Sequence, residues 1–144
     1  MNKKRIFDLF DDSPEMENKV KEQKKSLSVF NHSPNHKLGM FTKLIINHYV
    51  FHQKLEKFLK QEEPNYDVQS TKEASEFVVF NRAWNYISQV NPDEVLSKNA
   101  ILDFNFDLLD QTLESALMYF EGFEEYEKCA HIYKIQKLSQ KRKK

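Results

Sequence analysis

The sequence predicts an all-α fold, a small bundle of four to five helices that ends in an antiparallel helical hairpin. Its 144 residues include only two glycines and four prolines, which leaves an all-β protein short of turn residues. Apolar side chains between residues 38 and 138 recur at spacings of three and four, the period of an amphipathic helix. We expect one helical domain over residues 37–140, a flexible polar arm over residues 1–36 and a basic tail over residues 141–144.

The predicted arm is polar and charged, and its apolar residues occur in two short islands without a sustained helical period. Such a segment cannot bury enough surface to offset its ordering entropy, which is roughly 1–2 kcal/mol per backbone residue. We therefore predict disorder, with at most a transient charged helix over residues 15–25. The Ser-Pro-Asn-His sequence at residues 33–36 predicts the turn that closes the arm.

Two long helices are expected at the start of the domain. The first runs from residue 38 to about residue 61, before Pro64, because proline disfavours helical geometry in the residue that precedes it. The second has Ser70 and Glu73 at capping-box spacing, which marks its beginning. Its apolar residues lie nearly all round the helix, so we predict that it is central and buried.

A short helix and a hairpin complete the predicted domain. Pro92 is expected at the first position of a short helix that ends near residue 98. Residues 101–107 alternate apolar and acidic side chains like a strand, and we expect extended chain there because a single strand has no partner. Helices over residues 106–121 and 124–140 then form an antiparallel hairpin, with Gly122 as a left-handed helix terminus.

Composition limits the classes of function. Basic and acidic side chains number 22 each, so no net field draws the chain to nucleic acid or to an anionic membrane. The single cysteine and the lack of a long apolar run indicate a chain of the reducing cytoplasm without membrane contact. The richness in Lys, Asn, Phe and Ile is typical of bacterial or phage genomes. Nucleic-acid binding, if present, would be weak and would use the basic end of the chain, Lys141, Arg142, Lys143 and Lys144.

No catalytic constellation is evident, and we expect neither an enzyme nor a cofactor. The sequence has no glycine-rich loop to hold phosphate. His48 and His52 lie four residues apart and suit two ligands of a metal ion, and folding would have to bring His131 or Cys129 close to complete a site. Partly buried histidines on a helix face are the alternative, and the sequence commits to no metal. Cys129 has no base on its own helix face and is expected to pack as a small apolar residue.

The last two helices resemble a known interaction module. The second of them opens with an aromatic residue, a glutamate, a variable residue and two small residues: Tyr126, Glu127, Lys128, Cys129 and Ala130. This pattern is similar to the UVR-type helical hairpin of excision-repair helicase subunits and of some bacterial chaperone ATPases and their adaptors. The sequence departs from the family at residues 133–134, where Tyr-Lys replaces an arginine-aspartate pair. The resemblance implies protein docking, for which we single out Tyr126 and Tyr133, although any antiparallel hairpin suits the same residues.

Two pentapeptides of the arm resemble the peptide by which bacterial replication and repair proteins bind the sliding clamp. They occupy residues 6–10 and 26–30, and both lack the customary leading glutamine. A disordered arm places such hydrophobic anchors in a pocket at small entropic cost. The anchors would be Ile6, Phe7, Leu9, Phe10, Leu27, Val29 and Phe30. The alternative is that these islands fold onto the protein's own helices or onto a second subunit.

The sequence as a whole predicts a non-enzymatic helical adaptor or accessory protein that docks on a larger assembly, such as bacterial or phage replication, repair or transcription machinery. Its partners would be proteins, and a homo-oligomer is compatible with the same features. The alternative is a nucleic-acid-binding accessory or regulatory protein that uses its basic termini.

Overall fold

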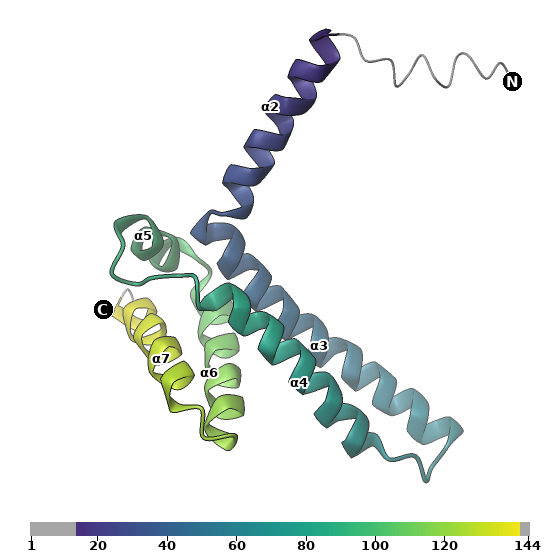
Figure 1. Cartoon of the computed structure of the whole chain (residues 1–144). Helices are drawn as coiled ribbons and strands as arrows, with labels where there is room; N and C mark the ends of the chain where they lie inside the picture. The colour runs from purple at the N-terminus through teal and green to yellow at the C-terminus, as the bar shows by residue number, and fades with distance from the viewer. Residues whose placement is uncertain (1–13, 142–144) are drawn as a thin grey trace, which may run out of the picture. The chain divides into compact units, whose positions relative to one another are not determined.

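The computed structural model describes residues 14–141, which contain six helices and no strand, so the predicted all-α fold is confirmed (Figure 1). These residues divide into two compact units at residue 33. The first contains helix α2 (Pro14–Asn31). The second contains the other five helices: α3 (Pro34–Glu62), α4 (Val68–Ile87), α5 (Val95–Asp103), α6 (Phe106–Gly122) and α7 (Tyr126–Gln140). None of the described helices combines the length and apolarity needed to cross a lipid bilayer.

Helix α2 is longer than the transient helix that the sequence predicted within the arm. Pro14 stands at its first position, where a proline costs no hydrogen bond, and Glu15 and Glu17 in the first turn complement the helix dipole. Four of its apolar side chains, Met16, Val20, Leu27 and Val29, are exposed. Residues 1–13, for which disorder was also expected, lie outside the described residues.

Helix α3 begins earlier than predicted because Pro34 opens it, so the expected turn at residues 33–36 is already mostly helical. It ends before Pro64, as the sequence indicated. The capping box predicted for α4 is wrong. Asp67 is the N-cap, and its side chain accepts hydrogen bonds from the backbone N–H and the hydroxyl of Ser70 at 3.1 and 2.6 Å. Ser70 therefore lies inside the first turn, because an aspartate three residues upstream caps equally well and starts the helix sooner.

Helix α5 also differs from its prediction at both ends. Asn91 forms a turn around Pro92 and accepts the backbone N–H of Asp93 at 2.9 Å, so the helix begins only at Val95. At its other end the predicted strand-like stretch is wrong, since the helix continues to Asp103. Only Phe104 and Asn105 separate α5 from α6, and the Asn105 side chain caps α6 by accepting the Leu108 N–H at 3.1 Å.

Helices α6 and α7 form the predicted antiparallel hairpin. Cys129 Sγ lies 3.9 Å from the Leu117 carbonyl oxygen, and Gln136 Nε2 donates to Glu114 at 2.8 Å. Later residues of α7 therefore lie beside earlier residues of α6, as in an antiparallel pair. The left-handed residue at the turn is Glu124 (φ 58°) and not Gly122, which has a negative φ.

A Schellman motif explains the position of this residue. The Glu124 N–H bonds to the Glu121 carbonyl, and the Glu125 N–H bonds to the Phe120 carbonyl, both at 3.0 Å. In that motif the residue after the C-cap, here after Phe123, is the left-handed one. Gly122 comes two residues too early to take the role that the sequence suggested.

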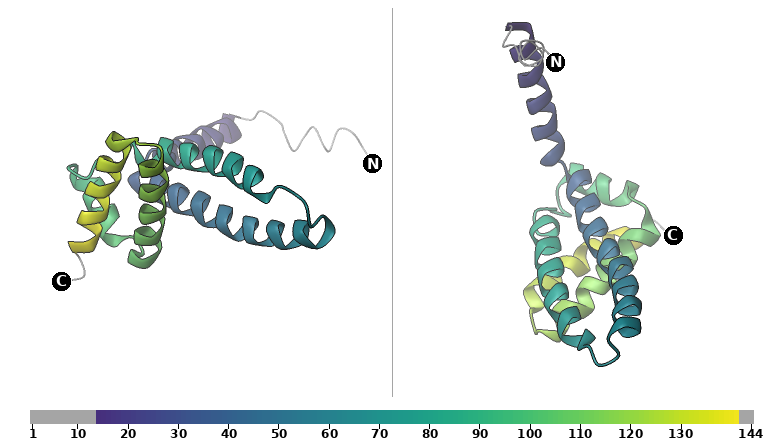
Figure 2. Two further views of the ribbon diagram at one scale, coloured as in Figure 1. Left: turned by 90° about the horizontal axis from the view of Figure 1, so that it is seen from below. Right: turned by 90° about the vertical axis from the view of Figure 1, so that its right-hand side faces the viewer.

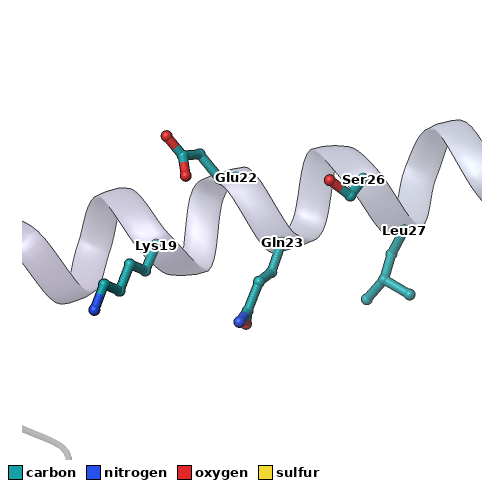
Figure 3. A pocket seen from close by; sticks show the side chains of 5 residues that line it. All are labelled: Lys19, Glu22, Gln23, Ser26 and Leu27. Atoms are coloured by element: carbon teal, nitrogen blue, oxygen red, sulfur yellow. The ribbon is translucent and has the colours of Figure 1, made fainter.

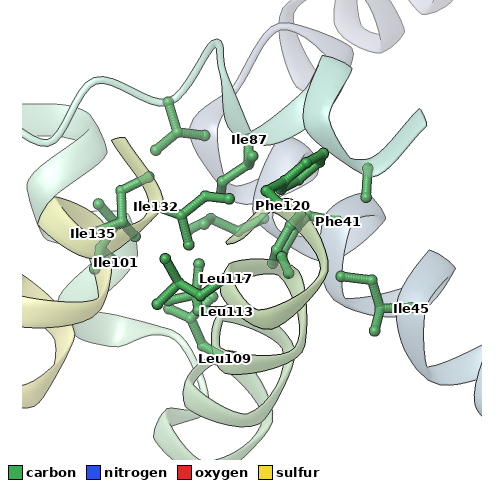
Figure 4. Close-up of a cluster of buried hydrophobic side chains, with 14 of the residues drawn as sticks. Phe41, Ile45, Ile87, Ile101, Leu109, Leu113, Leu117, Phe120, Ile132 and Ile135 are labelled. Carbon is green, nitrogen blue, oxygen red and sulfur yellow. The ribbon is translucent and has the colours of Figure 1, made fainter. Parts of the chain in front are cut away.

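The core of the five-helix unit is built around α6, whose buried side chains lie on one stripe (Figure 4). Residues of α3, α4, α5 and α7 converge on it, and Phe80 of α4 stacks on Tyr119 with ring centroids 4.4 Å apart. The prediction of a central, buried α4 is wrong, because Phe77 and Val78 are more than half exposed. The largest fully buried side chains are Phe41, Phe80, Phe120, Leu38, Ile45, Ile87, Ile101, Leu109, Leu113, Ile132, Ile135 and Val90.

Replacing Glu124 with glycine should stabilise the protein. A left-handed backbone costs a residue with a Cβ about 1 kcal/mol, and glycine avoids most of that cost. We expect Glu124→Gly to raise the free energy of unfolding by up to about 1 kcal/mol in urea titrations. Glu121→Gly, one turn earlier inside α6, is the matched control and should lower it by about the same amount. A destabilised Glu124→Gly protein would contradict the assigned turn.

Candidate protein-interaction groove

Half of the α3–α4 hairpin lies outside the core. No described residue between His48 and Phe80 is buried, although both helices continue through this stretch. Within the five-helix unit, the hairpin extends past α5, α6 and α7 (Figures 1 and 2). We call residues 49–79 the distal half of the hairpin, and it consists of two packed helices without a third layer.

The distal half exposes large apolar side chains. Phe51 is 60% exposed, and Phe58, Phe77 and Val78 are also more than half exposed. Monomeric soluble proteins rarely leave such side chains together on one element, and gathered apolar surface of this kind marks interaction sites.

Part of this apolar surface forms a groove between the two helices, with a volume of about 700 Å³. The groove residues on α3 follow one another at intervals of three, four and seven positions from the first, so they lie on one face of that helix. The groove residues on α4 are two pairs of neighbours, and the pairs are one helical turn apart. The lining residues of this α3–α4 groove are Leu44, Asn47, His48, Phe51, Ala74, Ser75, Val78 and Val79. A mostly apolar channel between two helices is the shape that accepts a third helix.

His48 lies on the groove wall and is only 6% exposed. Burial lowers its pKa below the ordinary value for histidine, and the positive charges of His52 and Lys72 lower it further. The rings of His48 and His52 are 4.4 Å apart between centroids, and the His48 ring also meets the edge of Phe80. A neutral His48 therefore behaves as part of the apolar wall near neutral pH.

The residues suggested as further ligands or as a nucleophile are used in helix packing. His131 donates from Nε2 to the Ile87 carbonyl oxygen at 2.8 Å, and its ring meets the edge of Trp84. Cys129 is buried against α6, and burial followed by the charges of Glu121 and Glu125 raises the pKa of its thiol. Among residues 14–141 no group of three or more histidine, cysteine or acidic side chains is arranged to hold a metal ion.

The predicted docking residues of the arm are only partly covered by the structure. Ile6, Phe7, Leu9 and Phe10 lie outside the described residues, as does the side chain of Phe30. Leu27 and Val29 lie exposed on α2. Leu27 projects from the same side of this helix as Lys19 and Gln23, along a hollow whose described wall is α2 alone (Figure 3). This hollow has too few apolar residues to define a binding site.

The predicted hairpin residues share one exposed face of α7. Tyr126 and Tyr133 are seven residues apart and at least half exposed, and Lys137 Nζ lies 5.1 Å above the Tyr133 ring. Lys141 is exposed at the end of α7, and it borders a small hollow with Lys98 of α5. Arg142, Lys143 and Lys144 lie outside the described residues. Docking through the tyrosines and nucleic-acid binding through the lysines stay predictions.

The groove itself was missed by sequence reasoning, which assigned Leu44, Phe51 and Val78 to the core. The available signal was the apolar residues all round α4, since a helix of a small bundle needs only one apolar stripe to reach its core. Apolar residues outside that one stripe indicate either that α4 is buried on all sides or that another molecule covers its second apolar face. The sequence does not distinguish the two.

Comparisons of the chain with protein-family models, with curated proteins and with solved structures found no match. Support for a function therefore comes from the geometry of the described residues.

Acidification should destabilise the protein through His48. The folded state holds the pKa of His48 below 6.5, so neutral His48 stabilises the fold fully above that pH. As the pH falls below 6.5 the unfolded chain takes up the proton first, and this stabilisation is lost. We expect the Tm of His48→Gln to fall less than that of the unsubstituted protein between pH 7.5 and pH 5. Asn47→Gln, at a residue of the groove wall that carries no titratable group, is the control and should follow the unsubstituted protein. Identical pH profiles for His48→Gln and the unsubstituted protein would refute this role.

Proposed function

We propose that this chain is a non-enzymatic helical interaction protein that docks on a larger assembly through the α3–α4 groove. One observation carries the proposal: an apolar groove between α3 and α4 extends from the edge of the core into the part of the hairpin that has no third layer of its own. The proposed assembly is the replication, repair or transcription machinery of a bacterium or phage. In this proposal the chain acts as an adaptor or accessory protein, through docking and not through catalysis.

The energetics favour docking at this surface. Burying an exposed side chain of the size of Phe51 or Val78 contributes about 1.5–3 kcal/mol. Both side chains extend from long helices, so little backbone entropy is lost when a partner covers them. A groove between two helices also presents its anchors at fixed spacing, which is how amphipathic helices are recognised.

The resemblance of α6 and α7 to the UVR-type hairpin supports a docking role from a different part of the chain. Tyr126 and Tyr133 are exposed on one face of α7, at the surface that such a module would offer to a partner. The clamp-like peptide at residues 6–10 would add a third contact. In this proposal the groove provides most of the affinity, because it places apolar side chains of two long helices beside one another.

The double variant Phe51→Ser with Val78→Ser tests the proposal. Both side chains are exposed, so the free energy of unfolding should change by less than about 1 kcal/mol, while partners captured from the host should be lost. The matched control is Val95→Ser with Leu96→Ser, because both residues are at least as exposed but lie on α5, away from the groove. The measurement is quantitative co-purification from the host with each tagged protein.

If the Phe51→Ser, Val78→Ser protein kept every partner of the unsubstituted chain, the groove would not be the docking surface. A third protein, with Phe7→Ala and Phe10→Ala, measures what the arm contributes under the same conditions.

A further inference from the structure

We infer that the α3–α4 groove binds an amphipathic helix of a partner protein that carries carboxylates beside its apolar stripe. The inference rests on the proposed docking function and names the chemistry of the partner. Three observations support it: cations border the groove, the nearby acids are paired with other lysines or face elsewhere, and the apolar surface is long enough for a helix.

Cations border both walls of the groove. On α3, Lys54 stands three residues after Phe51, and Lys43 stands four residues before Asn47. On α4, Arg82 stands four residues after Val78. Residues three or four apart lie on the same side of a helix, so these cations lie beside the lining residues.

The acids near the hairpin are already paired or face elsewhere. Glu76 is the one acid three or four positions from a lining residue, and it lies 3.8 Å from Lys72. Burial, and then the charges of Glu76 and Glu125, raise the pKa of Tyr119, so Glu76 lies near this residue of α6. Glu56 pairs with Lys60 at 2.9 Å. Within the described part of the chain, Lys43, Lys54 and Arg82 have no carboxylate within ion-pair distance, so their charges are available to a partner.

The length of the apolar surface fits a helix. From the partly buried Leu44 to the exposed Phe58, the apolar stripe of α3 advances by fourteen positions, or about 21 Å along the helix. A partner helix of four turns covers that distance and places its apolar side chains between the two walls. A nucleic acid suits the site less well, because its phosphates would lie over an apolar floor and few cations would reach them. An amphipathic helix with acidic flanks would bury its apolar side chains in the groove and pair its carboxylates with the bordering cations.

Two synthetic helices test the inference on the full-length chain. Both are fluorescein-labelled 16-residue peptides with leucine along one stripe, and they differ only in having glutamate or lysine at the flanking positions. Fluorescence anisotropy at physiological ionic strength should show the glutamate peptide binding about tenfold more tightly. The double variant Lys54→Glu with Arg82→Glu should reverse that preference.

A control variant and the alternative occupant complete the experiment. Lys98→Glu with Lys134→Glu removes two cations outside the groove and should leave the preference unchanged. Equal affinity for both peptides, or no binding of either, would overturn the acidic-helix inference. The proposed docking function would then still be tested separately, by the capture experiment with Phe51→Ser and Val78→Ser.

Residues 6–12 of this chain also combine apolar and acidic side chains. If Phe7→Ala with Phe10→Ala raised the affinity for the glutamate peptide about tenfold, that segment would be the occupant and the partner inference would be wrong. An unchanged affinity supports an external helix.

Discussion

The extent of the core is set by the place at which α6 and α7 cross the α3–α4 hairpin. These two helices run across the hairpin at a steep angle beside one half of it, and the rest of the 29-residue α3 extends past them (Figures 1 and 2). The core around Leu113 and Phe120 therefore covers only one half of the hairpin. The other half stays a two-helix layer whose apolar side chains face water, and the proposed docking surface follows from this.

Much of the fold could be predicted from local patterns. The spacing of apolar residues located α3, α6 and α7 to within a few residues, and the short connection between the last two helices required a hairpin. Local patterns failed where two signals of similar strength competed. Asp67 outweighed Ser70 as a cap, and the hydrogen bonds of the Schellman motif selected Glu124 over Gly122. Both choices depend on free-energy differences of about 1 kcal/mol, which sequence patterns do not resolve.

The groove could not be predicted for a different reason. Phe51 and Val78 are apolar residues at helical spacing, as the core residues Phe41 and Ile45 are, because a groove for a helix is an unfilled core position. What separates the two sets is their distance from the place at which α6 and α7 cross the hairpin, a tertiary property. The docking residues proposed from sequence, Tyr126 and Tyr133, rested on a local resemblance, and the structure adds that they share an exposed face of α7.

Hydrogen exchange of backbone amides in the free protein tests most directly whether the core covers only one half of the hairpin. If it does, amides of residues 109–120 exchange only through global unfolding, and amides of residues 50–60 exchange through local opening at least about tenfold faster. Equal protection along the whole of α3, from the core to the tip of the hairpin, would show that the distal half is already covered in the free chain. That result would contradict the open groove and the docking function built on it.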